Sequence, residues 1–191
     1  MGGFRSRLLE AMRACIAENG YTATTVADVV RCARTSRRTF YEHFVDKEDC
    51  FVAVLTDDNA TLIRQISTSV DPKLPWQEQI RQAVTAWINY AESHPAMMLS
   101  WIRDAPRLGA TMRDLQRQFM EGFIAMMQTL SSTDHLRAAG IAPVPRQRAI
   151  MLLGGLRELT ATTLEQGGQM TDIADEAVQA AEVLLAPFAG A

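Results

Sequence analysis

The stretch Thr25-Val-Ala-Asp-Val-Val-Arg-Cys-Ala-Arg-Thr-Ser-Arg-Arg-Thr-Phe-Tyr-Glu-His-Phe44 decides the fold of the first part of this chain. Its first half carries apolar residues at i, i+3, i+4 and i+7, which predicts a short helix with one buried stripe: Val26, Val29, Val30 and Ala33. Thr25 precedes this stripe and Asp28 follows three residues later, so we expect a capping box at the helix start.

The second half of the stretch predicts another short helix after a tight turn. Ser36 can cap it, and Phe40 and Phe44 lie four residues apart on one inward face. The remaining positions carry hydrogen-bond donors: Arg37, Arg38, Thr39, Tyr41 and His43. A short helix that presents donors and positive charge beside a capped partner helix is typical of a helix-turn-helix that binds DNA.

Three motifs extend this pattern: Gly20-Tyr-x-x-Thr-Thr, Ser36-x-x-Thr-Phe-Tyr-x-His-Phe and Asp46-Lys-Glu. In this order they resemble the N-terminal domain of the TetR family of transcriptional repressors, over roughly residues 4 to 55. Two positions differ from the family pattern, because Arg34 and Arg38 stand where that family commonly has Gly. Either Arg34 adopts the left-handed conformation, at a cost of roughly 1–2 kcal/mol, or the turn differs.

The resemblance implies that hydroxyl, imidazole and ammonium groups in this region bind the phosphate backbone. Arg37 and Arg38 are our candidates for base edges, because a guanidinium binds guanine in a bidentate manner. The alternatives are that Tyr41 is a packed surface aromatic and that His43 caps the helix or pairs with Glu42. The residues predicted to bind DNA are Thr25, Ser36, Arg37, Arg38, Thr39, Tyr41, His43 and Lys47.

The charge distribution favours the same interpretation. The 191 residues carry a net charge of −3, which argues against a general nucleic-acid coat protein. Residues 31–43, however, contain four arginines against Glu42 alone. The sequence has no signal-peptide pattern and no apolar run long enough to span a bilayer, so we expect a cytoplasmic protein. The spacing of Cys and His predicts no metal site, and no motif predicts a cofactor.

The predicted fold class is all-α, with an N-terminal three-helix helix-turn-helix head (residues 1–50) and a C-terminal helical ligand-binding and dimerisation body (residues 51–191). No segment sustains the apolar–polar alternation of a strand. The expected helices besides the helix-turn-helix are 4–19, 47–70, 76–94, 96–104, 106–130, 146–166 and 172–188. Residues 131–145 contain Gly140, Pro143 and Pro145, and they predict a loop.

Large, soft side chains concentrate in the middle helices of the body. Aromatic residues give rigid walls and Met adapts to different shapes, so we predict a pocket for a lipophilic ligand, as the resemblance also implies. The alternative is that these residues only pack a core. The predicted ligand-binding residues are Trp87, Tyr90, Met98, Trp101, Met120, Phe123 and Met127.

The last two helices are apolar on more than one side, which predicts a second partner. A four-helix bundle across a two-fold axis would supply it, although the alternative is packing within one monomer. The predicted dimer interface is Leu152, Leu156, Leu159, Val178, Ala181 and Leu185.

These features favour a homodimeric transcriptional repressor that binds double-stranded, palindromic operator DNA and is released by a small lipophilic effector. A transcriptional activator or a corepressor-dependent regulator of the same fold is the nearest alternative. A helical enzyme or a protein-binding adaptor is less favoured, because no catalytic motif is present and an adaptor needs no arginine cluster.

Overall fold

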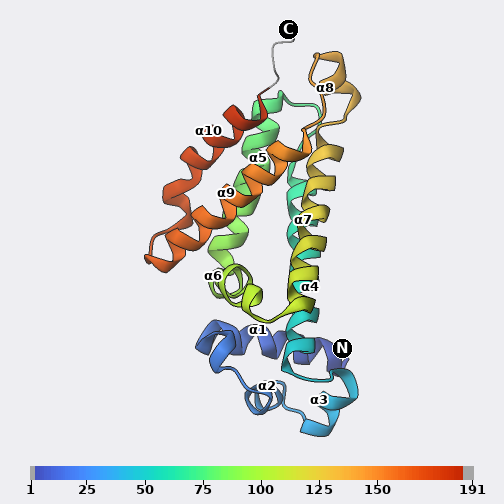
Figure 1. Ribbon diagram of the computed structural model, residues 1–191, viewed down its shortest axis with the longest axis vertical. Helices are drawn as coiled ribbons and strands as arrows, with labels where there is room; N and C mark the ends of the chain where they lie inside the picture. The colour runs from blue at the N-terminus through green and yellow to red at the C-terminus, as the bar shows by residue number, and fades with distance from the viewer. Residues whose placement is uncertain (1–2, 187–191) are drawn as a thin grey trace. The chain divides into compact units, whose positions relative to one another are not determined.

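The structure, a computed structural model, describes residues 3–186 of the chain. Every regular element in these residues is helical, which confirms the all-α prediction (Figure 1). The α-helices are α1 (Phe4–Ala23), α2 (Val26–Cys32), α3 (Arg37–His43), α4 (Lys47–Ser69), α5 (Trp76–Ser93), α6 (Pro95–Leu99), α7 (Ala110–Leu130), α8 (Asp134–Ala138), α9 (Arg146–Glu165) and α10 (Ala174–Leu185). Shorter π- and 3₁₀-helical turns are η1 (Ser100–Asp104), η2 (Ala105–Arg107) and η3 (Met170–Ile173).

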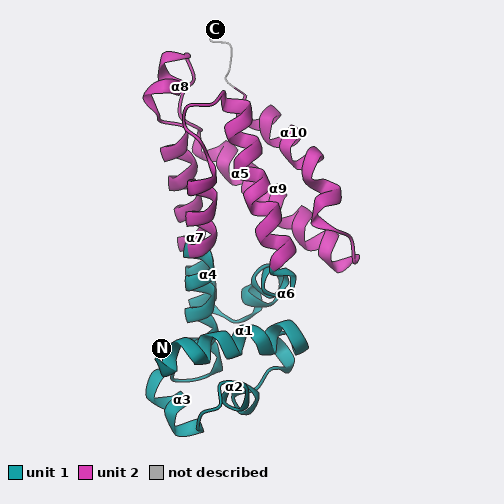
Figure 2. Ribbon diagram, turned by 180° about the vertical axis from the view of Figure 1, so that it is seen from behind, with its two compact units in different colours: residues 1–60, 94–116 teal, residues 61–93, 117–191 magenta. Residues whose placement is uncertain are grey.

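The described residues form two compact units, which Figure 2 shows in different colours. Unit 1 lies within residues 1–60 and 94–116, and unit 2 lies within residues 61–93 and 117–191. Helices α4 and α7 each contribute residues to both units. The predicted domain boundary after residue 50 therefore stays a prediction.

The helix-turn-helix of unit 1 has the caps that the sequence predicts. The Thr25 hydroxyl accepts a hydrogen bond from the Asp28 amide, and the Asp28 carboxylate accepts one from the Thr25 amide, which completes the capping box. The Ser36 hydroxyl accepts from the Thr39 amide at the start of α3. Phe40 is fully buried and Phe44 nearly so, hence one face of α3 is fixed against the core.

The turn between α2 and α3 is left-handed at Arg34, whose φ is 49°. The amide of Thr35 donates to the Val30 carbonyl and the amide of Arg34 to the Arg31 carbonyl, at 3.0 and 3.2 Å. These two bonds form a Schellman motif, whose left-handed position is usually Gly. The first of the two sequence-based alternatives for Arg34 is therefore the one that the structure adopts.

The end of α1 is closed by a cation from α4. Gly20 has φ 74° and ψ 162°, so the helix breaks there, close to its predicted end. The Lys47 ammonium donates to the carbonyls of Tyr21 (3.0 Å) and Thr24 (2.9 Å) and lies 4.2 Å from the Tyr21 ring centre. The same ring stacks on Phe51 at 4.1 Å, which joins the end of α1 to α4.

Unit 2 is built around the packing of α10 on α5 and α9 (Figure 1). The Trp87 indole of α5 donates to the Thr160 hydroxyl of α9 at 3.0 Å, and both side chains are buried. The Met170 amide donates to the Glu92 carboxylate, which ties the start of the last helical segment to α5.

Three predicted segments differ from the structure. The helix predicted over 96–104 is α-helical only to Leu99 and then continues as a π-turn and a 3₁₀-turn, because Pro106 has no amide to extend the ladder. Helix α7 begins only after Gly109, whose φ is 94°. The predicted loop 131–145 contains the short helix α8, which the Thr133 hydroxyl caps. The last helix is described to Leu185, and Phe188 lies outside the described residues.

Within residues 3–186, no helix combines the length and the apolar character that a membrane crossing requires.

The left-handed turn predicts a difference between two substitutions of Arg34. We expect Arg34→Gly to unfold with a free energy about 0.5–1 kcal/mol larger than Arg34→Ala, because only Gly adopts this φ without a Cβ clash. Both variants lose the same charge, so urea denaturation followed by circular dichroism isolates the backbone effect. Equal stability of the two variants would show that Arg34 is unstrained.

Candidate DNA-binding surface and ligand cavity

Helix α3 presents its predicted DNA-binding residues away from the core. Arg37, Arg38 and His43 are exposed, and 57% of Tyr41 is exposed although its ring meets the edge of Phe40 at 5.4 Å. The Tyr41 ring therefore packs against Phe40 on one side, and more than half of the residue remains exposed. The Glu42 carboxylate pairs with the Arg38 guanidinium at 3.1 Å. The alternative role for His43 was an ion pair with this same carboxylate.

The hydroxyl groups of this surface are already engaged within the helix-turn-helix. The Thr25 hydroxyl donates to the Asp28 carboxylate at 2.6 Å, and Ser36 and Thr39 share a hydroxyl–hydroxyl bond of 3.0 Å. Hydrogen bonds from the Thr25 side chain and amide, with Arg31 nearby, lower the pKa of Asp28. An ionised carboxylate thus lies beside the predicted phosphate contact at Thr25.

Lys47 is half-buried, and two of its three N–H donors are used by backbone carbonyls of unit 1. Desolvation lowers the pKa of its ammonium group, while the carboxylate of Asp104 acts in the opposite direction. One donor is left for the phosphate contact that the resemblance implies, so Lys47 has a structural role that the sequence reasoning missed.

The arginines of the surface differ in their partners. Arg31 pairs with Asp28 at 2.8 Å and Arg38 with Glu42, whereas Arg34 and Arg37 have no ion-pair partner among residues 3–186. Arg34 was not among the predicted contacts, but its side chain is exposed in the turn that leads to α3, and it joins the candidate set. The signal in the sequence was an Arg where the resembled family commonly has the turn Gly.

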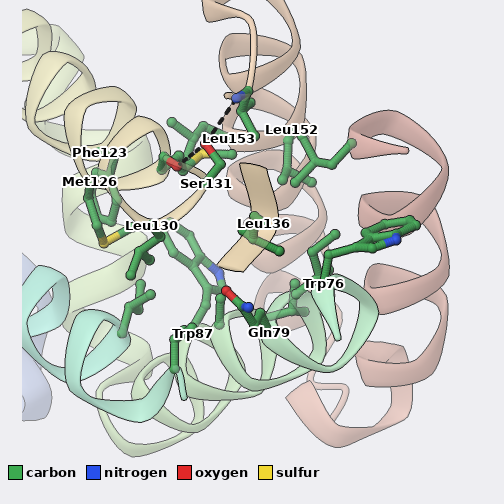
Figure 3. A pocket seen from close by; sticks show the side chains of 18 of the residues that line it. Trp76, Gln79, Trp87, Phe123, Met126, Leu130, Ser131, Leu136, Leu152 and Leu153 are labelled. Carbon is green, nitrogen blue, oxygen red and sulfur yellow. Dashed lines mark hydrogen bonds between the residues drawn. The ribbon is translucent and has the colours of Figure 1, made fainter. Parts of the chain in front are cut away.

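A cavity of about 120 Å³ lies within unit 2 (Figure 3). Three of the predicted ligand-binding residues line it: Trp87, Phe123 and Met127. Tyr90 and Met120 belong to the same unit but do not line the cavity, and Met98 and Trp101 belong to unit 1. Met98 is buried in that unit.

The walls of the cavity come from more of the chain than the sequence indicated. Residues of α4, α5, α7, α9 and α10 contribute, and so do residues of the segment 131–144. Sequence reasoning missed Trp76 and Gln79 of α5 and Leu136 of α8, which Figure 3 shows around the cavity. None of the described residues that line it carries a charge.

The residues predicted for the dimer interface are largely used within unit 2. Leu152, Leu156, Val178 and Ala181 are buried, and Leu159 and Leu185 are half-buried. Leu152, Leu156 and Leu185 line the cavity. The exposed apolar residues of these helices are a different set: Ile150 and Met151 on α9 and Val183 on α10.

Comparison with known sequences identifies the N-terminal region. The family model described as "Bacterial regulatory proteins, tetR family" matches residues 8–54. The HTH-type transcriptional repressor AcnR of Corynebacterium glutamicum is 36% identical over 63 residues, which are 33% of this chain and 34% of AcnR. The uncharacterized HTH-type transcriptional regulator YhgD of Bacillus subtilis is 24% identical over 147 residues, 76% of either chain.

Solved structures share the fold over nearly the whole chain. The regulator FadR of Bacillus subtilis, in complex with stearoyl-CoA, superimposes with a TM-score of 0.79 at 16% identity and covers 95% of this chain and 97% of its own. A putative TetR-family regulator of Syntrophomonas wolfei gives a TM-score of 0.79 at 17% identity, over 97% and 96%. The match over residues 8–54 contains the complete helix-turn-helix, so this part of the chain is similar to the DNA-binding domain of the tetR family of bacterial regulatory proteins, and the relatives named above support a TetR-family transcriptional regulator.

Proposed function

We propose that the chain is a homodimeric repressor that binds a palindromic operator and is released when a small lipophilic effector enters the cavity of unit 2. The observation that carries this proposal is a pair of arginines without an ion-pair partner among the described residues: Arg34 in the turn before α3 and Arg37 at its first position, on a helix whose other face is fixed by Phe40. We take the cytoplasm, where operator DNA is reached, as its location.

The base-reading role falls to Arg37 and Arg38. Arg38 is 90% exposed, and its bond to Glu42 is a surface ion pair that costs little to exchange for a guanine. Ser36, Thr39 and the amide groups at the α3 N-terminus would position the helix on phosphate, because such contacts orient a protein without reading sequence. Tyr41 and His43 extend this contact along the exposed side of α3.

The effector role rests on the cavity. It is enclosed mainly by apolar and aromatic side chains, as small-molecule sites usually are. FadR of Bacillus subtilis, which shares the fold, was solved in complex with stearoyl-CoA, and we carry over only the idea of a lipophilic ligand. Helix α4 supports coupling, since Lys47 begins it in unit 1 and Ile66, near its end, lines the cavity.

The dimer role rests on the outward side of α9 and α10. Ile150, Met151 and Val183 are exposed there, and Gly154 and Gly155 lie in the middle of α9. A Cβ at either glycine would meet no atom within 4 Å, so nothing in the described chain requires Gly at these positions. Because Gly weakens a helix interior, we infer that a helix of a second copy approaches there. We propose this face beside the six residues predicted from sequence, of which four are buried and two half-buried within the single chain.

Substitution of the two candidate base-reading arginines tests the DNA-binding role. In selection from random duplex DNA at low salt, the native protein should enrich one palindrome, and Arg37→Ala/Arg38→Ala should not, since each contact supplies about 1–3 kcal/mol of discrimination. Arg64→Ala, an exposed arginine of unit 2, is the matched control and should enrich the native sequence. Enrichment of that same palindrome by the double variant would refute the assignment of these arginines.

Two exposed valines test the dimer face. Val183 is 79% exposed and Val45, in unit 1, is 81% exposed, so Val→Glu at either position disturbs the single chain equally little. We expect the native protein and Val45→Glu to elute in size-exclusion chromatography with light scattering at twice the 21.2 kDa chain mass. Val183→Glu should shift toward the monomer, because the interface would bury an unpaired carboxylate. A fully dimeric Val183→Glu protein would place the interface elsewhere.

A further inference from the structure

The cavity wall has few polar side chains, and their hydrogen-bond donors already bind other groups of the protein. The Trp87 indole donates to Thr160, and the Ser131 hydroxyl donates to the Met127 carbonyl while it accepts from the Val144 amide. These bonds hold the wall together and leave no donor of these residues for a ligand. An anionic ligand would therefore find neither a cation nor an unused donor on these side chains.

Gln79 is the exception, because it has an unused acceptor. Its amide nitrogen donates to the carbonyls of Leu74 (2.8 Å) and Pro72 (3.4 Å), and these two acceptors fix which end of the amide is nitrogen. The amide oxygen accepts no hydrogen bond from the described residues. The side chain is only 6% exposed and lies among Trp76, Trp87 and Leu136 (Figure 3).

The Gln79 amide oxygen keeps some accessible surface and has no donor among the described residues, so a ligand that supplies a donor there completes its hydrogen bonding. Water can supply a donor, and an apolar ligand that displaces this water leaves the oxygen unpaired. A ligand with one hydroxyl or N–H group instead satisfies Gln79 while the rest of its surface meets apolar walls. A carboxylate would place its negative charge against the amide oxygen, with no compensating cation.

The size of the cavity limits the ligand further. At about 120 Å³ it is somewhat smaller than the engineered cavity of roughly 150 Å³ that binds benzene in another protein. One six-membered ring with small substituents is therefore of the size that this space accommodates.

We propose that the effector site selects a compact, uncharged ring compound with a single hydrogen-bond donor, such as a phenol or a cyclic alcohol, and that Gln79 Oε1 accepts its hydrogen bond. This proposal rests on the proposed function only in naming the cavity as the effector site. Binding itself is independent of DNA and can be measured on the purified full-length protein alone.

The first test varies the ligand and leaves the protein unchanged. Isothermal titration calorimetry compares 4-methylphenol with 4-fluorotoluene, which has the same shape but no donor, and with 4-methylbenzoate. The phenol should bind about 5-fold tighter than 4-fluorotoluene, as one net hydrogen bond predicts. The benzoate should bind at least roughly 30-fold more weakly than the phenol, because its charge is buried unpaired. Equal affinities, or tightest binding of 4-methylbenzoate, would overturn the proposal.

The second test varies the protein. Gln79→Leu should remove the advantage of 4-methylphenol over 4-fluorotoluene, while Ala83→Leu, which fills the cavity wall, should weaken both ligands alike. Gln79 also holds the carbonyls of Pro72 and Leu74, so a variant that fails to fold leaves the ligand comparison on the native protein to decide. Gln79→Leu that still prefers the phenol would exclude Gln79 as its acceptor.

A DNA-binding measurement separates the two proposals. If 4-methylphenol binds as expected but saturating amounts leave operator affinity unchanged, the ligand assignment stands and the effector-release mechanism fails. If operator DNA binds but none of the three ring compounds does, the ligand assignment is overturned and the DNA-binding function stands.

Discussion

The ammonium group of Lys47 is the contact on which the geometry of unit 1 depends. Helix α1 breaks at Gly20, and the last carbonyl groups of a helix need partners from outside it. Lys47, at the first position of α4, donates to two such carbonyls and covers the Tyr21 ring. The Lys47 ammonium therefore joins the two ends of the segment 25–46, which contains α2 and α3. The exposed side of α3 has a defined orientation because this segment cannot open without leaving a half-buried charge unpaired.

The helix-turn-helix divides its polar residues between folding and recognition. The hydroxyls of Thr25, Ser36 and Thr39 are tied into caps, so phosphate would have to share them with bonds that the fold already uses. The guanidinium groups of Arg34 and Arg37 form no ion pair with the described residues. The helix-turn-helix therefore uses its hydroxyl groups to fix the helices, while the two arginines remain available to bind an anionic partner.

Contacts between residues close in the chain could be predicted from the sequence, because caps and turns depend on side chains within about four positions. The capping box of Thr25 and the cap at Ser36 belong to this class, and the fold class follows from their order. Membership of the cavity could not be predicted in the same way. Met98 and Phe123 are both large and apolar, and only tertiary packing puts one in the core of unit 1 and the other at the cavity wall. Leu152 and Leu156 were likewise predicted to contact a partner, but they are buried within unit 2 and line the cavity.

The segment between α7 and α9 contributes Ser131, Leu136, Ile141, Ala142 and Val144 to the cavity wall. Connecting segments tolerate insertions and substitutions better than packed helices do. The side of the cavity that is easiest to change therefore belongs to a part of the chain that carries none of the proposed DNA contacts. Under the proposed function, substitutions in this short stretch would change the compound that triggers release, while the operator sequence, and hence the genes under control, would stay the same.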